Sequence, residues 1–215
     1  MEIIKAAVSF AKEKMSAFDG GHDWFHSERV LNLSKHIQKK EGKGDLLVIE
    51  LAAILHDIAD TKFHSGSEND GGDMAYDFLL DHEYPKDDAD HVRRIINNIS
   101  FKKRLEKETI NTIEYQIVQD ADRIDAIGAI GIARAFNYGG YKNRPLYDPS
   151  IPLVNYVSME EYKNSPAPTI NHFYEKLFLL KDLMNTPTAK ALAKERHDYM
   201  LEFVKRFMSE YDGEI

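Results

Sequence analysis

The chain has 215 residues, of which 43% are hydrophobic and 30% charged, and it contains no cysteine. Its length and composition fit one large or two small globular domains and exclude global disorder, while the missing cysteine excludes disulfides, thiolate metal sites and cysteine nucleophiles. The formal net charge of −8 disfavours binding to duplex nucleic acid or to an anionic membrane, although a bound cation could still attract a small anionic substrate.

No part of the chain has the pattern of a targeting or membrane-spanning segment. The segment Met1–Phe18 contains three lysines and no long apolar run. The most apolar window, Leu46–Leu55, is interrupted by Glu50 and is too short to span a bilayer. We therefore expect a cytoplasmic protein without a membrane partner.

Apolar residues recur at helical spacing almost throughout the chain. A first amphipathic helix is predicted by the stripe Ile3, Ile4, Ala7, Val8 and Ala11. A second helix is predicted over 23–40, where Gly42 and Gly44 end it and Asp45 can cap the next one. Segment 46–57 is apolar nearly all round, which allows a strand or a helix. Its length and its leucine and alanine content favour a buried central helix.

Further helices are predicted at 68–81, 86–99, 109–119 and 121–136, with a turn at Tyr84-Pro85. From 137 to 168 the periodicity lapses into a glycine- and proline-containing insertion that could be a lid, a substrate loop or an interface. Helices at 169–184 and 186–211 close the chain. The glycine pairs at 20–21, 71–72 and 139–140 are interpreted as turns, because none has the strand–loop–helix context of a phosphate loop. The prediction is an all-α fold in one domain, residues 1–215.

Three polar clusters interrupt apolar surroundings, namely residues 22–26, His56-Asp57 and residues 119–125. Buried imidazole and carboxylate groups are costly unless they are paired or bound to a cation. One histidine of the first cluster, the His-Asp pair and one aspartate of the third would supply two nitrogen and two oxygen donors. Such a set without sulfur suits Mn²⁺, Fe²⁺, Co²⁺ or Ni²⁺, with Mg²⁺ or Zn²⁺ as alternatives. Two positions of a six-coordinate ion would remain for water and substrate.

The order His26 … His56-Asp57 … Asp122 resembles the H…HD…D signature of the HD-domain superfamily of metal-dependent phosphohydrolases. The resemblance covers about 19–136 and is carried by the neighbourhoods 23–30, 53–58 and 120–125. It implies an all-α metal-binding core over about 19–136 and hydrolysis of phosphoester or phosphoanhydride bonds in nucleotides. The C-terminal extension 137–215 lies outside the resemblance, and we expect it to pack on this core. Residues 118–138, with Asp148-Pro149, also resemble small stand-alone bacterial HD hydrolases, some of whose relatives resemble nucleoside triphosphate pyrophosphohydrolases.

The resemblance assigns roles to individual residues. The implied metal ligands are His26, His56, Asp57 and Asp122, and Mn²⁺ is the first expectation for the ion. Asp60 falls where relatives often carry an acidic residue near the attacking water, so its predicted role is general base or water orientation. Lys62 and His64 follow in the same loop and could meet phosphate oxygens. Because cations stabilise phosphoryl transfer, the predicted substrate-binding residues are His22, Arg29, Lys102, Lys103, Arg123 and Arg144.

Several of these residues have a second interpretation. His22 and His26 are four residues apart and could form a zinc pair, or His22 could cap the second helix. Asp125 could lie behind the ligands, and Asp120 could cap a helix that begins near it. The basic run 102–104 could bind polyphosphate or be a solvated helix start. A final group could stack on a base, bury the subunit contact of a homodimer or pack within the loop: Tyr138, Tyr141, Tyr147 and Tyr156.

The leading hypothesis is a metal-dependent phosphohydrolase with a small-molecule nucleotide substrate, which hydrolyses (deoxy)nucleoside triphosphates to monophosphate and pyrophosphate by metal-activated water. A nucleotidase acting on a nucleoside monophosphate is the first alternative, and hydrolysis of a cyclic or alarmone signalling nucleotide is the second. Two other classes are a non-catalytic nucleotide-sensing HD module and a helical protein with buried salt bridges. All four signature positions are filled, which favours catalysis.

Overall fold

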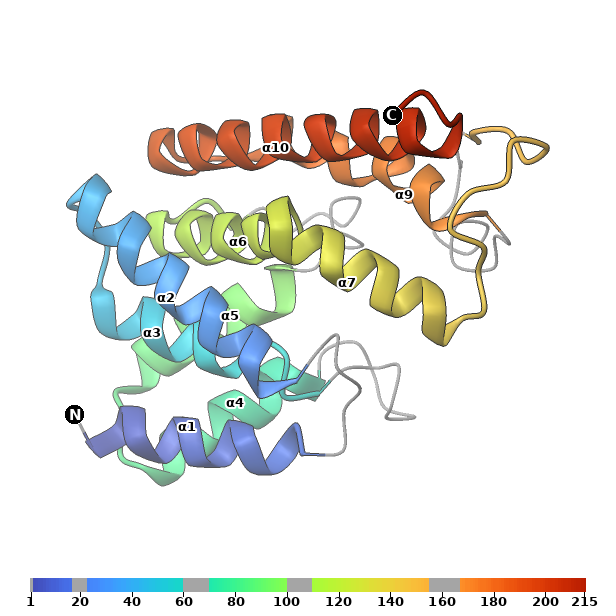
Figure 1. The fold of residues 1–215 in the computed structure, drawn as a ribbon. Coiled ribbons are helices and arrows are strands. Elements are labelled where there is room, and N and C mark those ends of the chain that lie inside the picture. Colours follow the sequence, from blue (N-terminus) through green and yellow to red (C-terminus); the bar gives the residue numbers. More distant parts are fainter. Residues whose placement is uncertain (1, 17–22, 60–69, 100–109, 155–166) are drawn as a thin grey trace. The chain divides into compact units, whose positions relative to one another are not determined.

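The computed structural model describes residues 2–16, 23–59, 70–99, 110–154 and 167–215 (Figure 1). Within these ranges every regular element is a helix and there is no strand, so the predicted all-α fold is confirmed. None of the helices in these ranges combines the length and hydropathy that a bilayer span requires. The chain folds as two compact units, residues 1–122 and 123–215. The assignment of the whole chain to one domain stays a prediction.

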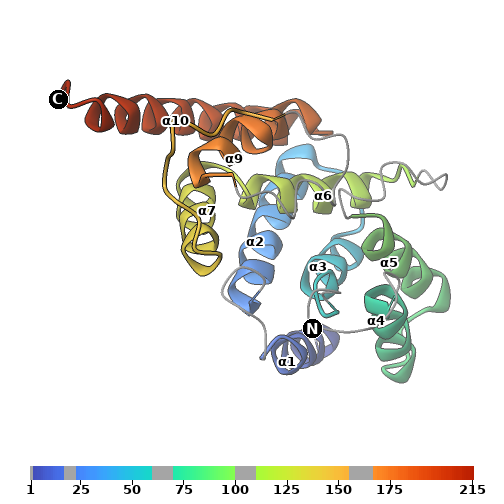
Figure 2. The ribbon, with the colours of Figure 1, turned by 90° about the vertical axis from the view of Figure 1, so that its right-hand side faces the viewer.

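The first unit is built around a short apolar helix, α3 (Leu46–Leu55), which confirms the helical interpretation of this segment. Seven of its ten residues are buried, and it contacts α1, α2, α4 and α5. Figure 2 shows α3 flanked by α2 and α5. The other helices of the unit are α1 (Glu2–Lys14), α2 (Trp24–Glu41), α4 (Asp70–Asp81), α5 (Lys86–Ile99) and all but the last turn of α6 (Ile113–Asp125).

Local capping residues fix the ends of α2 and α3. The Asp23 carboxylate accepts a hydrogen bond from the backbone N–H of His26 and begins α2. Asp23 thus occupies the N-cap position, and the alternative that His22 caps this helix falls on a residue outside the described ranges. Gly42 ends α2 in the left-handed conformation, with φ of 66°. Asp45 accepts from two backbone N–H groups of α3, as predicted.

The second unit packs α10 (Pro187–Tyr211) against α7 (Gly128–Tyr141) and a 3₁₀ helix, η2 (Leu177–Leu183), while α9 (Thr169–Glu175) contacts both α7 and η2. An aromatic cluster joins three of these helices. The Phe203 ring of α10 lies 5.9 Å from the Phe136 ring of α7 and 6.0 Å from the Phe173 ring of α9. Because aromatic rings bury large apolar areas, this cluster contributes to the apolar contact among the three helices.

Three predictions about the helices and turns are wrong. Helix α6 continues through Asp120, so this residue caps no helix. Asp120 is fully buried, and the break between helices falls at Ala126-Ile127 instead. The single helix predicted at 169–184 is divided into α9 and η2. The glycine pairs at 71–72 and 139–140 lie inside α4 and α7 rather than in turns. The physical reason is close packing, because Asn97 lies against Gly72 and Thr169 lies against Gly139, where a Cβ would not fit.

The His172 side chain, in α9, makes the stability of the second unit sensitive to acid. Burial lowers the pKa of His172 to about 3, and the charges of Lys176 and Arg144 add to this effect. In the unfolded chain the pKa is about 6.5, so the unfolded state takes up a proton first as the pH falls. The loss of stability is absent above pH 6.5 and grows as the pH falls from about 6.5 towards 3.

We expect acidification from pH 7 to 5.5 to cost about 1 kcal/mol more in the wild-type protein than in the variant His172→Gln, which carries no titratable group at this position. Urea unfolding at the two pH values measures the difference. His36→Gln, at an exposed position of α2, is the control and should behave as the wild type. Equal acid sensitivity of wild type and His172→Gln would contradict the prediction.

Candidate metal centre

Three helices of the first unit bring four polar side chains together. His26 is the third residue of α2, Asp122 lies three residues before the end of α6, and His56 and Asp57 follow the last residue of α3. The two histidine side chains are each 2% exposed, whereas those of Asp57 and Asp122 are 22% and 33% exposed. The cluster is therefore closed on the imidazole side and open on the carboxylate side.

The ligand atoms of this cluster have the spacing of one coordination shell. The Nε2 atom of His26 lies 3.2 Å from Nε2 of His56 and 3.3 Å from Oδ1 of Asp122, and the latter oxygen lies 3.9 Å from Nε2 of His56. Oδ2 of Asp57 lies 3.6 Å and 3.8 Å from the two imidazole nitrogens. Neighbouring donors around an ion with bonds of about 2.1 Å are roughly 3.0–3.4 Å apart. One donor atom each of His26, His56 and Asp122 all lie within 4.8 Å of one another, and Asp57 lies beside this group, close to both imidazole nitrogens.

A backbone carbonyl sets the tautomer of His56. Its Nδ1 lies 2.9 Å from the Ala53 carbonyl oxygen, near the end of α3. A carbonyl can only accept, so Nδ1 carries a proton and Nε2 is the ring nitrogen that faces the cluster. Two imidazole nitrogens and two carboxylates that face one another need a proton or a cation between them, and the hydrogen bond from His26 to Asp122 is the protonated case. This donor set therefore fits a divalent metal ion.

Asp122 is ionised in this setting. Burial raises its pKa, but the hydrogen bond from His26 and the electrostatic attraction of His26 and His56 outweigh this, and the pKa lies below its usual value. The nearby Asp57 carboxylate acts in the opposite direction. The cluster thus holds an anionic oxygen at neutral pH, which a cation requires.

Of the other predicted catalytic and substrate-binding residues, three are described. Arg29 is half-buried on α2, three residues after His26. In the second unit, Arg123 donates to the Leu183 carbonyl, and Arg144 lies over a tyrosine ring of α7, 5.7 Å from its centroid. Their contact with phosphate stays a prediction. The other predicted residues lie outside the described ranges: His22, Asp60, Lys62, His64, Lys102 and Lys103.

Two contacts near the centre are not evident from the sequence. One is the Ala53 carbonyl, for which a histidine directly after a helix is only a weak signal. The other is the ion pair of Asp125 with Arg134 of α7, in which the oxygen and nitrogen lie 2.7 Å apart. The sequence allows Asp125 a place behind the ligands, but nothing in its pattern points to Arg134 as the partner.

Comparison with known proteins places this cluster in a family context. Residues 24–127 match the HD domain family. The protein YpgQ of Bacillus subtilis is 42% identical over 195 residues, which cover 90% of this chain and 86% of YpgQ. A crystal structure of YpgQ is a complex with ADP. It has a TM-score of 0.76 and 34% identity in the structural alignment, and covers 97% of this chain and 95% of YpgQ.

Two other crystal structures are similar over nearly the whole chain. A protein from Lactobacillus plantarum has a TM-score of 0.82 and 39% identity, with 99% of this chain and 98% of that chain covered. An HD-superfamily hydrolase from Bacillus thuringiensis has a TM-score of 0.78 and 42% identity, with 98% and 97% covered. The similarity thus extends well beyond the segment that carries the four clustered side chains.

Proposed function

The chain belongs to the HD-domain family, and we propose that it is a metal-dependent phosphohydrolase that cleaves (deoxy)nucleoside triphosphates to monophosphate and pyrophosphate. The observation that carries the proposal is the convergence of one donor atom each of His26, His56 and Asp122 within 4.8 Å of one another, with the Asp57 carboxylate beside both histidines. The ADP complex of the similar YpgQ supports a nucleotide with a phosphoanhydride bond as the ligand class.

The four side chains would hold one divalent cation through two imidazole nitrogens and two carboxylate oxygens. Such an ion lowers the pKa of a bound water and neutralises phosphate charge. Mn²⁺ is the first choice for this mixed donor set, and Mg²⁺, Co²⁺, Ni²⁺, Fe²⁺ and Zn²⁺ are the alternatives to test. The Ala53 carbonyl keeps the lone pair of His56 turned towards the ion.

The open side of the cluster determines where the substrate would bind. The carboxylates of Asp57 and Asp122 are the exposed members, so phosphate and water would enter from their side. In the proposed reaction Asp60 takes a proton from the attacking water, and Lys62 and His64 contact phosphate oxygens. Arg29 lies about one helical turn after His26 on α2, and in this proposal it binds the same phosphates. Further binding residues in this proposal are His22, Lys102, Lys103, Arg123 and Arg144.

A panel of nucleotides tests the proposal. We expect release of pyrophosphate and an equal amount of monophosphate from nucleoside or deoxynucleoside triphosphates with Mn²⁺. In water enriched in ¹⁸O the label should enter the monophosphate, because attack at the α-phosphorus puts the new oxygen there. The panel also contains nucleoside monophosphates and cyclic and alarmone nucleotides, with orthophosphate and pyrophosphate measured separately.

Each other result of the panel has a definite meaning. Orthophosphate released from monophosphates alone would replace the proposal by a nucleotidase, and turnover of signalling nucleotides alone would replace it by the corresponding hydrolase. Nucleotide binding without turnover of any substrate with Mn²⁺, Mg²⁺, Co²⁺ or Ni²⁺ would instead indicate a sensing module.

A further inference from the structure

The last turn of α6 is held by side chains that are distant in sequence. Nη1 of Arg196, on α10, lies 2.6 Å from the carbonyl oxygen of Ile124 and 3.5 Å from that of Ile127. The final carbonyls of a helix have no partner within the helix and carry a partial negative charge. A guanidinium group, which is planar and always charged, satisfies both needs. Arg196 therefore acts as a cap for the C-terminal end of α6.

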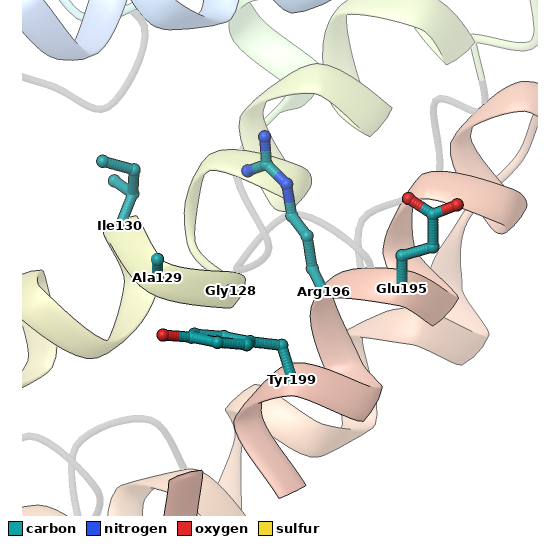
Figure 3. A pocket seen from close by; sticks show the side chains of 6 residues that line it. All are labelled: Gly128, Ala129, Ile130, Glu195, Arg196 and Tyr199. Atoms are coloured by element: carbon teal, nitrogen blue, oxygen red, sulfur yellow. The ribbon is translucent and has the colours of Figure 1, made fainter. Parts of the chain in front are cut away.

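The first residue of α7, Gly128, leaves space for the Arg196 side chain because it has no Cβ. Gly128 has a φ of +79°, a backbone conformation that residues other than glycine rarely adopt. A Cβ at this position would lie 2.9 Å from Cγ of Arg196. Figure 3 shows Arg196 beside Gly128, with its guanidinium directed away from α10, while the Tyr199 ring extends under Ala129. The position of Arg196 thus depends on a glycine at 128, and the carbonyls of the turn between α6 and α7 depend on Arg196 as a donor.

Two further contacts tie down the same turn. Asp125, whose side chain is 1% exposed, pairs with Arg134 at 2.7 Å. Arg123, two residues earlier, donates to the Leu183 carbonyl. Charge-assisted hydrogen bonds of buried groups are strong and only weakly screened by salt. The three residues directly after Asp122 are therefore each fixed by a partner in the second unit.

We infer that Arg196 is a positioning residue for the metal centre, because by capping the last turn of α6 it keeps that turn helical and with it the backbone that carries Asp122, two residues before Ile124. This inference rests on the proposed metal ligands. A metal ion binds only if its donors lie within a few tenths of an ångström of their places. Partners that orient the ligands typically change metal affinity by about 10–100-fold.

The test measures Mn²⁺ affinity by electron paramagnetic resonance, without substrate. We expect Arg196→Met to bind Mn²⁺ about tenfold more weakly than the wild type, and Arg196→Lys, which keeps the charge but loses the planar fork, to lie in between. Gly128→Ala displaces the arginine without removing it and should weaken binding in the same direction. The matched control is Arg206→Met, which removes an exposed arginine of the same helix and should stay within about twofold of the wild type.

Hydrogen–deuterium exchange of the metal-free proteins gives an independent readout. The N–H groups of Ala126 and Ile127 bond to carbonyls of this turn and should exchange faster in Arg196→Met than in Arg206→Met. If Arg196→Met and Gly128→Ala lower the melting temperature but keep the wild-type Mn²⁺ affinity, Arg196 is only structural and the inference is wrong. Mn²⁺ binding by the wild type without turnover of any nucleotide would contradict the proposed function and leave this inference testable. No Mn²⁺ binding by the wild type would overturn both.

Discussion

Asp57→Ala is expected to abolish hydrolysis and metal binding while leaving the helical content almost unchanged. The side chain lies in the turn after α3, is 22% exposed, and its Oδ2 faces the nitrogens of His26 and His56. Its removal takes away one proposed ligand without opening a cavity in the core. The loss of turnover should exceed about 100-fold, which is the upper range for residues that only orient ligands.

Three measurements check this result on the same preparation. Nucleotide turnover gives the activity, elemental analysis gives the bound metal, and far-ultraviolet circular dichroism gives the helix content. Asp77→Ala is the control, because Asp77 is an exposed aspartate of α4 in the same unit. Wild-type turnover by Asp57→Ala would show that the reaction takes place elsewhere, and unfolding of this variant alone would show that Asp57 has a structural role instead.

Arg134→Met is expected to destabilise the protein by about 3 kcal/mol. The guanidinium of Arg134 pairs at 2.7 Å with Asp125, whose side chain is 1% exposed. Loss of Arg134 takes its positive charge away from a buried carboxylate, which is more costly than loss of both members of the pair. Urea-induced unfolding followed by circular dichroism measures the change.

A double variant separates the buried charge from lost packing. Arg134→Met combined with Asp125→Leu removes both charges and should recover much of the stability, because apolar replacements of a buried ion pair are often tolerated. Lys194→Met is the control for an exposed pair. Lys194 and Asp198 lie 2.5 Å apart on α10 with side chains 74% and 55% exposed, so no measurable change is expected. No recovery in the double variant would assign the loss to packing.

Features of the fold that depend on nearby residues were predictable from the sequence. Asp45 and Gly42 mark helix ends by their own chemistry, and the length of segment 46–55 with its leucine and alanine content favours a buried helix. Features that depend on distant residues were not. Gly139 is inside α7 because Thr169, thirty residues later, packs against it, and Asp120 continues α6 because the fold buries it.

The features of the candidate site were likewise predictable only where they depend on nearby residues. The spacing of His26, His56-Asp57 and Asp122 with apolar neighbours indicated which side chains meet, because each motif sits at or near a helix end. The orientation of His56 by the Ala53 carbonyl depends on where α3 ends. Arg196 is 72 residues from Ile124, whose carbonyl it caps, and an arginine in the middle of a long helix gives no sign of such a role.

The unequal exposure of the four clustered side chains has a consequence for the choice of ion. A hydrated cation that bound at the proposed centre would meet the carboxylate oxygens of Asp57 and Asp122 first and would have to shed further water before it reached the buried nitrogens of His26 and His56. Mg²⁺ gives up its water reluctantly and prefers oxygen, so it would stop at the rim. An ion that exchanges water readily and accepts imidazole would go on to the inner position, and the centre would thereby select its metal by the ease of dehydration.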